Sequence, residues 1–288
     1  MLLEPRLRDA QALLLAGHPR RAADRCTRAL GRPVPTGTPG LKAAFGALRA
    51  EALLCLGDLA AAQRQAETAA RTAPPGSALT LWPTAVLAQA LTEQGRYEEA
   101  ARQLRHAAPG PLPDTAYALP YLRARGRYLL ATGPAEEALT DFLRAGQLAT
   151  RRDAAVFSHL PWRTDAAEAL LRLGRPEQAA DLITEQSGAA GDLGARHRGI
   201  ALRVRAATEE PVRRPGTLAR ATVELRAAGD RLELARAYAG LGDALSELGE
   251  DSMADAMLGR ARHLAADCGA APLLWHTLPT APPVLPVP

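Results

Sequence analysis

Polar side chains recur along the chain at positions that could line a binding groove. One lies six residues before each of six regularly spaced glycines, and together these residues are Gln11, Glu51, Gln89, Arg127, Glu168 and Asp243. Carboxylates and guanidinium groups bind charged ligands, and carboxylates also transfer protons. The stripe therefore marks candidate ligand-binding positions, although a solvated helix face would carry the same pattern.

Further residues on a similar face extend the candidate groove. Arg123 and Arg127 are suited to binding a carboxylate, and Trp82 would supply a flat apolar contact. Arg163 follows Pro161 and Trp162 in a segment that also reads as a helix start, so Trp162 is expected to pack between structural units. The predicted ligand-binding residues are Glu51, Trp82, Gln89, Arg123, Arg127, Arg163, Glu168 and Arg172.

Motifs for catalysis, metals and cofactors are missing from the sequence. The six histidines and three cysteines show no His-Glu-x-x-His or Cys-x-x-Cys spacing, and no Gly-x-Ser-x-Gly occurs. The sole lysine, Lys42, cannot complete a phosphate-binding loop. We therefore predict no catalytic residue, no metal site and no cofactor.

Composition predicts an all-α chain. Of 288 residues, 63 are Ala and 46 are Leu, against two Ile, eight Val and eleven aromatics. Ala and Leu favour helices, whereas strands favour β-branched and aromatic residues. A sizeable sheet is therefore excluded.

Charge and hydropathy bear on location and partners. No apolar run reaches the roughly 18 residues of a membrane helix, and the three cysteines are too few and too far apart for a disulfide framework. The net charge of +4 comes from 35 basic and 31 acidic residues that alternate along predicted helices. We therefore predict a cytoplasmic protein. We expect that it does not bind membranes and does not bind DNA directly.

A pattern of glycine, four mostly polar residues and alanine recurs six times. The glycines are Gly17, Gly57, Gly95, Gly133, Gly174 and Gly249, at intervals of 40, 38, 38, 41 and 75 residues. Leucine lies four residues before every glycine, and Ala or Gly lies seven before it. Because spacings of three, four and seven share one helix face and glycine ends helices, each copy predicts a helical hairpin. The long last interval predicts a degenerate copy that is irregular near residues 208–216.

The pattern resembles the tetratricopeptide repeat, as in Leu91–Ala100 and Leu170–Ala179. The resemblance implies a right-handed α-solenoid of about seven helical hairpins over residues 1–268, with the first helix of each hairpin on the concave face. The expected repeats lie near 1–33, 41–75, 78–110, 114–150, 160–190, 193–229 and 231–268. A Pro-rich extended tail is expected over 269–288.

Three longer segments, Leu122–Leu130, Leu160–Gly174 and Leu232–Gly242, are similar to the repeat region of large ATP-binding regulators of the LuxR family, the maltose-activator type of actinobacteria. Such regulators combine an ATPase, a helical sensor and a DNA-binding helix-turn-helix. Neither flanking part is recognisable here, so the resemblance implies a sensor region alone.

Three functional hypotheses follow. The first is a non-catalytic module that binds a peptide, protein or small effector in its groove. The alternative is a biosynthetic enzyme in which Glu51 and Glu168 act as acid and base. The third is a scaffold that forms a homodimer through an exposed first repeat containing Leu13, Leu14 and Leu15.

Overall fold

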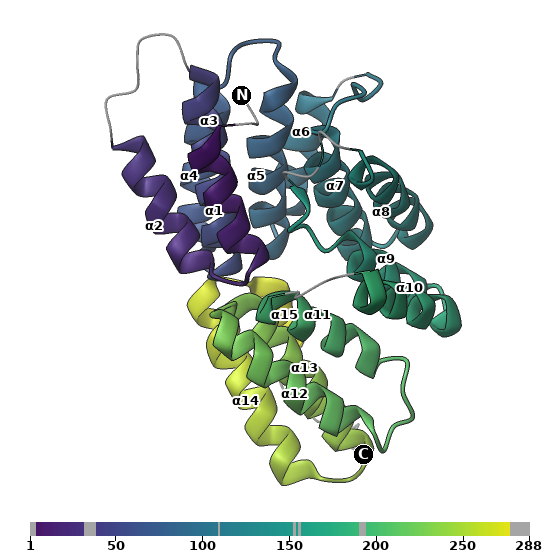
Figure 1. Ribbon diagram of the computed structural model, residues 1–288. Helices are drawn as coiled ribbons and strands as arrows, with labels where there is room; N and C mark the ends of the chain where they lie inside the picture. Colours follow the sequence, from purple (N-terminus) through teal and green to yellow (C-terminus); the bar gives the residue numbers. More distant parts are fainter. Residues whose placement is uncertain are drawn as a thin grey trace, which may run out of the picture.

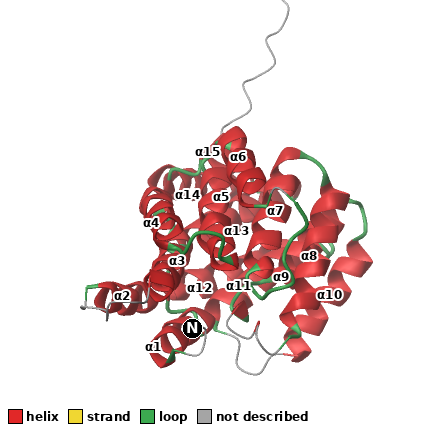
Figure 2. Ribbon diagram, turned by 90° about the horizontal axis from the view of Figure 1, so that it is seen from above, coloured by secondary structure: helices red, strands yellow, loops and turns green. Residues whose placement is uncertain are grey.

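The computed structural model describes residues 4–31, 39–108, 110–151, 154, 157–189 and 194–276. Within these ranges the chain consists of helices and the turns that join them, without a strand (Figure 2). The predicted all-α solenoid of helical hairpins is therefore confirmed. None of the described helices is both long and apolar enough to span a membrane.

Seven helical hairpins follow one another and end in a short last helix (Figure 1). The bounds are α1 (Pro5–Leu15), α2 (Pro19–Leu30), α3 (Pro39–Cys55), α4 (Leu59–Thr72), α5 (Leu81–Glu93), α6 (Tyr97–Ala107), α7 (Ala118–Thr132), α8 (Ala135–Ala149), α9 (Trp162–Arg172), α10 (Pro176–Ala189), α11 (Ala195–Ala206), α12 (Arg214–Ala228), α13 (Arg231–Glu247), α14 (Asp251–Cys268) and α15 (Ala271–His276), with a 3₁₀ turn, η1 (Ala78–Thr80), before α5.

The glycines of the sequence pattern form the turns inside the hairpins. All six have a positive φ, between 70° and 123°. Side chains with a Cβ rarely adopt this conformation, which explains why glycine recurs at this position. In the degenerate sixth hairpin, the glycine with a positive φ follows the second helix instead of the first. This residue is Gly229, which caps α12 with φ 71°.

The small residues seven positions before these glycines allow the two helices of a hairpin to approach closely. Ala10, Ala50, Ala88 and Ala167 are completely buried. At Gly126, a Cβ would lie 2.5 Å from the ring of Phe142 on the partner helix. The column therefore reflects backbone packing rather than a binding function.

The first helices of the hairpins form an inner layer in which α1, α3, α5, α7, α9, α11 and α13 contact one another in series. The last helix of this series, α13, also contacts α3, so the inner layer curves back on itself. Arg231 Nε donates a hydrogen bond to the Leu56 carbonyl oxygen at 2.7 Å, and Cys268 packs against Gly57. The last hairpin thus docks on the second, at the junction of the two halves in Figure 1.

Three expectations concern the tail, the sixth hairpin and the first repeat. Residues 271–276 form α15 rather than an extended tail, because Pro272 is tolerated in a first helical turn and Leu273 packs on the core. The rest of the predicted tail, 277–288, lies outside the described residues. Residues 207–213 form turns between α11 and α12 in the sixth hairpin, and α12 starts at Arg214, within the range expected to be irregular. Leu14 is buried and Leu13 and Leu15 are half-buried, and the homodimer through the first repeat stays a prediction.

Candidate functional site

The eight predicted ligand-binding residues separate into four locations. Glu51 and Trp82 lie beneath the chain segment that precedes α9, and Gln89 and Arg123 lie midway along the inner layer. Arg127, Glu168 and Arg172 line a cavity in the C-terminal half of the inner layer. Arg163 lies apart from these groups, with its guanidinium 4.4 Å from the centre of the Trp162 ring.

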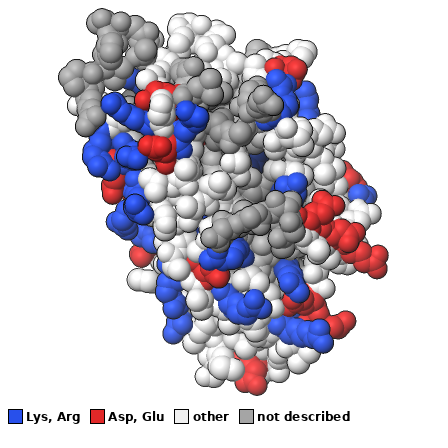
Figure 3. All heavy atoms as spheres, in the orientation of Figure 1, with Lys and Arg blue, Asp and Glu red and all other residues white. Residues whose placement is uncertain are grey.

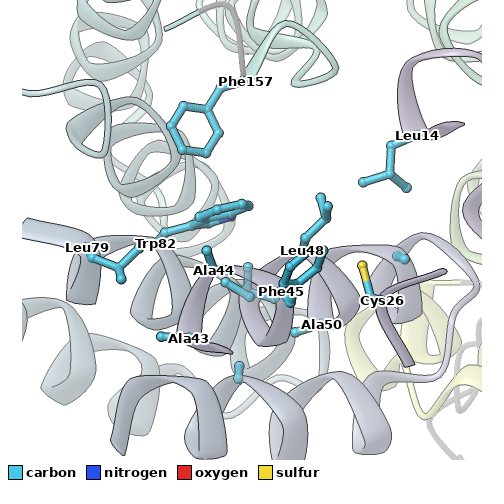
Figure 4. Packing of buried hydrophobic residues seen from close by; sticks show 14 of the residues in the cluster. Leu14, Cys26, Ala43, Ala44, Phe45, Leu48, Ala50, Leu79, Trp82 and Phe157 are labelled. Atoms are coloured by element: carbon cyan, nitrogen blue, oxygen red, sulfur yellow. The ribbon is translucent and has the colours of Figure 1, made fainter. Parts of the chain in front are cut away.

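Trp82 does not present a face to an exposed groove. Its side chain is completely buried, and Phe157 lies edge-on at 5.0 Å between ring centres (Figure 4). Tyr117 is stacked on Trp82 at 6.5 Å. Glu51 is covered in the same way, since its Oε2 is 2.9 Å from Nε2 of His159. The prediction of an accessible apolar contact at Trp82 is therefore wrong, because the chain itself fills this part of the groove.

Arg123 binds a carboxylate, but that carboxylate belongs to the same chain. Its Nε lies 2.5 Å from Oδ2 of Asp165, and its Nη1 donates to Oε1 of Gln89 at 3.2 Å. Both charged side chains are more than nine-tenths buried. The expectation that Arg123 binds a ligand carboxylate is thus wrong, since Asp165 already occupies its guanidinium.

A cavity of about 580 Å³ occupies the inner face of the C-terminal half. Its apolar walls include Leu130, Leu171, Ala239 and Leu273. Its charged lining comes from five different helices, and the residues are Glu93, Arg127, Glu168, Arg172, Arg203, Arg236 and Asp243. The volume falls in the range of small-molecule sites.

Five of the charged residues of this lining close, together with Glu233 of α13, into a ring of alternating Glu and Arg. Going round the ring, the residues are Glu93, Arg127, Glu168, Arg203, Glu233 and Arg236. Glu168 Oε2 is 2.6 Å from Nη1 of Arg127, and Arg236 Nη2 is 2.5 Å from Oε2 of Glu93. The ring joins α5, α7, α9, α11 and α13, and its charges cancel.

The ring keeps the carboxylates of Glu168 and Glu233 ionised. Burial alone would raise the pKa of Glu168, but the charges of Arg203 and Arg127 outweigh burial and lower the pKa to about 2. The pKa of Glu233 is also lowered, because Arg203 and Arg236 offset the effect of its burial. A carboxylate held in this state cannot accept a proton near neutral pH.

Acid is expected to destabilise the fold through this ring. A carboxyl group whose pKa is lowered by folding stabilises the protein above its unfolded pKa, near 4.5, and loses that contribution as the pH falls towards 2. The urea midpoint should therefore decrease steadily between about pH 5 and pH 2. Glu168→Gln should reduce the steepness of this decrease, and an unchanged slope would contradict the assignment.

Arg172 differs from the other arginines of the cavity. Its side chain is exposed, and within the described residues it forms neither an ion pair nor a hydrogen bond. Since the ring beside it is neutral, Arg172 is the cation of the lining that is available to a ligand.

Four ring residues, Glu93, Arg203, Glu233 and Arg236, are absent from the predicted ligand-binding set. Arg203 lies in the sixth hairpin, which lacks the glycine that aligned the other copies. Glu233 and Arg236 lie two to three helical turns before the aligned position, Asp243. Their role arises from closure of the solenoid, for which the repeat pattern contains no signal.

Metal ligands and reactive thiols do not gather in the described part of the chain. No group of three His, Cys, Asp or Glu side chains there could hold a metal ion. Burial raises the pKa of Cys26 to about 12 and that of Cys55 and Cys268 to about 11, and all three are free thiols. Thiols of this kind are poor nucleophiles at neutral pH.

The outer surface carries both charge signs. On the face in Figure 3, basic side chains gather at the flank near α2 and acidic ones at the opposite flank near α10. Arg20, Arg21 and Arg28 are exposed on α2, and Glu177, Asp181 and Glu185 are exposed on α10. This face therefore lacks the single basic surface typical of DNA-binding domains.

Comparisons with known proteins agree with the repeat architecture. The tetratricopeptide repeat family matches residues 43–68, 81–106 and 161–183, which lie in α3–α4, α5–α6 and α9–α10. A search of curated protein sequences finds no match. Among solved structures, a Rap protein complexed with competence and sporulation factor has a TM-score of 0.56 at 13% identity, covering 83% of this chain and 69% of that one.

A second similar structure is the APC/C hetero-tetramer Cut9–Hcn1, with a TM-score of 0.50 at 13% identity. The alignment covers 94% of this chain and 55% of that one, so this chain spans about half of its length. At such identities the likeness concerns the fold alone. Together with the family match, it shows that this chain is an α-solenoid that contains tetratricopeptide repeats.

Proposed function

We propose that this chain is a non-catalytic interaction module that binds a small effector or the end of a peptide in the cavity beside the Glu–Arg ring. The observation that carries this proposal is the composition of the cavity. The cavity has a volume of about 580 Å³, and its lining combines apolar walls with one exposed arginine that has no partner. Ligand sites typically pair a mainly apolar lining with a few placed polar groups.

The charge distribution supports a ligand with an anionic group and an apolar body. The ring beside the cavity is neutral, and its members already satisfy one another. Asp243 of the same lining balances the charge of Arg172, so the attraction for an anion is local to the exposed guanidinium of Arg172. A carboxylate or phosphate is the natural partner of a guanidinium group. Leu130, Leu171 and Leu273 would contact the apolar body of the ligand.

The enzyme alternative has less support. Its two candidate carboxylates lie apart, since Glu51 is bonded to His159 and Glu168 belongs to the ring. Glu168, with a pKa of about 2, is too weak a base for proton transfer near neutral pH.

The relation to LuxR-family regulators rests on the sequence resemblance, and we propose on that basis that the module is a sensor. The fold likeness to a Rap protein that was solved with competence and sporulation factor is consistent with a solenoid that receives a signal. We further propose that the protein acts in the cytoplasm.

Arg172→Ala should weaken ligand binding while leaving the fold intact. The purified chain would be screened by native mass spectrometry and thermal shift against apolar organic anions, such as N-acetylleucine and octanoate, and against extracts of the producing cell. For a bound anion, the variant should lose about tenfold in affinity, because a charge-assisted hydrogen bond contributes about 1.5 kcal/mol or more. Arg220→Ala, at an exposed position on α12, is the control. Equal binding by the two variants would contradict the proposed role of Arg172.

A further inference from the structure

The segment Phe157–Leu160 lies on the inner surface of the N-terminal hairpins. Residues 150–161 separate α8 from α9, whereas only Gly229 and Asp230 separate α12 from α13. The other connections between hairpins are also shorter, and the longest of them is residues 108–117 between α6 and α7. Phe157 and His159 are 1% and 5% exposed, whereas Ser158 is exposed and Leu160 is half-buried, so the first two side chains hold the segment in place.

Two side chains and one carbonyl group fix this segment on three different helices. The Phe157 ring meets Trp82 of α5 edge-on (Figure 4). It also lies 6.1 Å from Tyr117 between ring centres. His159 bonds to Glu51 of α3 at 2.9 Å. Its carbonyl oxygen accepts a hydrogen bond from Nε2 of His197 on α11, also at 2.9 Å. An aromatic ring and an imidazole two residues later are therefore the anchors.

The fit of the segment is incomplete. Trp82 Nε1 and His159 Nδ1 are buried and have no hydrogen-bond partner. A buried polar group without a partner destabilises the structure relative to one that is hydrogen-bonded. A different segment on the same surface would therefore bind better than Phe157–Leu160 if it offered an acceptor to the indole N–H of Trp82.

We propose that Glu51, Trp82 and Tyr117 form a peptide-binding surface that Phe157–Leu160 occupies within the chain, and that a partner protein binds there by replacing this segment. The partner segment carries an aromatic residue two positions before a histidine or another cation. The aromatic residue packs edge-on against Trp82 as Phe157 does, and the cation pairs with Glu51 in a site where that charge is shielded from water. This surface is separate from the cavity beside Arg172, and the proposal does not depend on it.

The test uses the full chain with its own anchors removed. In Phe157→Ala/His159→Ala, the emptied surface is offered a capped pentapeptide with the sequence of residues 157–161, Phe-Ser-His-Leu-Pro. Binding is followed by NMR through the tryptophan indole N–H signals. The variant should bind the peptide about tenfold more tightly than the wild type does, because no internal segment competes. Alanine in place of the peptide's histidine, or Glu51→Gln in the variant, should weaken binding about tenfold.

A second variant keeps the test decisive if the alanine pair unfolds. Phe157→Leu/His159→Gln preserves most of the side-chain volume while removing the ring and the imidazole, and circular dichroism verifies its fold. The proposal is overturned if the folded variant shows no indole shift with the peptide, or if Glu51→Gln leaves the affinity unchanged. Arg172→Ala should not alter peptide binding. A tenfold loss in that variant would place the peptide in the cavity and would also overturn the proposal.

Discussion

Replacing Arg236 by alanine is expected to lower the free energy of unfolding by about 3–5 kcal/mol. Arg236 bonds to Glu93 of α5 and to Glu233 of its own helix, and all three side chains are at least four-fifths buried. Without the guanidinium, two buried carboxylates lose a counter-ion and face each other across the ring. Urea unfolding followed by circular dichroism measures the change.

Two companion variants identify the ring as the cause. Arg220→Ala, on the exposed face of α12, should change stability by less than about 0.5 kcal/mol. Glu93→Leu/Arg236→Met removes one charge of each sign and leaves the remaining ring neutral. The pair should therefore be less destabilising than the sum of its single substitutions, by about 0.5–3 kcal/mol. Strictly additive effects would show that the two residues do not interact.

Gly57→Ala is expected to destabilise the protein by about 2–5 kcal/mol, from two additive causes. Gly57 has φ 76°, a conformation that disfavours any residue with a Cβ. The added Cβ would also overlap Sγ of Cys268 and lie 3.2 Å from Cβ of Arg231, where the last hairpin docks on the second. Thermal and urea unfolding should both report the loss.

Gly249→Ala separates these two causes. Gly249 has φ 77° in the equivalent turn of the last hairpin, but no atom lies within 4 Å of the position of its Cβ. It should therefore show the backbone strain alone, about 1–2 kcal/mol. If Gly57→Ala cost no more than Gly249→Ala, the docking of the last hairpin on Gly57 would contribute nothing to stability.

Much of the fold could be predicted because its determinants are local in the sequence. Helical hairpins follow from the Ala and Leu content, from the small residues such as Ala50 and from the turn glycines, whose positive φ the structure confirms. Each of these features acts within one repeat. The same local structure is therefore encoded several times along a repeating sequence.

The content of the inner face could be predicted only in part. Arg127 and Glu168 have the same register in the polar column, and both line the cavity together with Arg172 from a later position on α9. Glu51 belongs to the same column, but the column could not show that the segment with Phe157 and His159 covers Glu51 and Trp82. The covering segment lies in the connection between two repeats, and the periodic pattern makes no prediction for such connections.

By itself, the sequence determined the helices, their pairing and the face on which polar residues gather, since these depend on contacts between residues close together in the chain. Only the tertiary structure decided which charges meet. Glu93 and Arg236 are 143 positions apart, and they pair because the solenoid curves until α13 reaches α3. Small rotations between successive hairpins add up to this closure, and no single repeat encodes their sum.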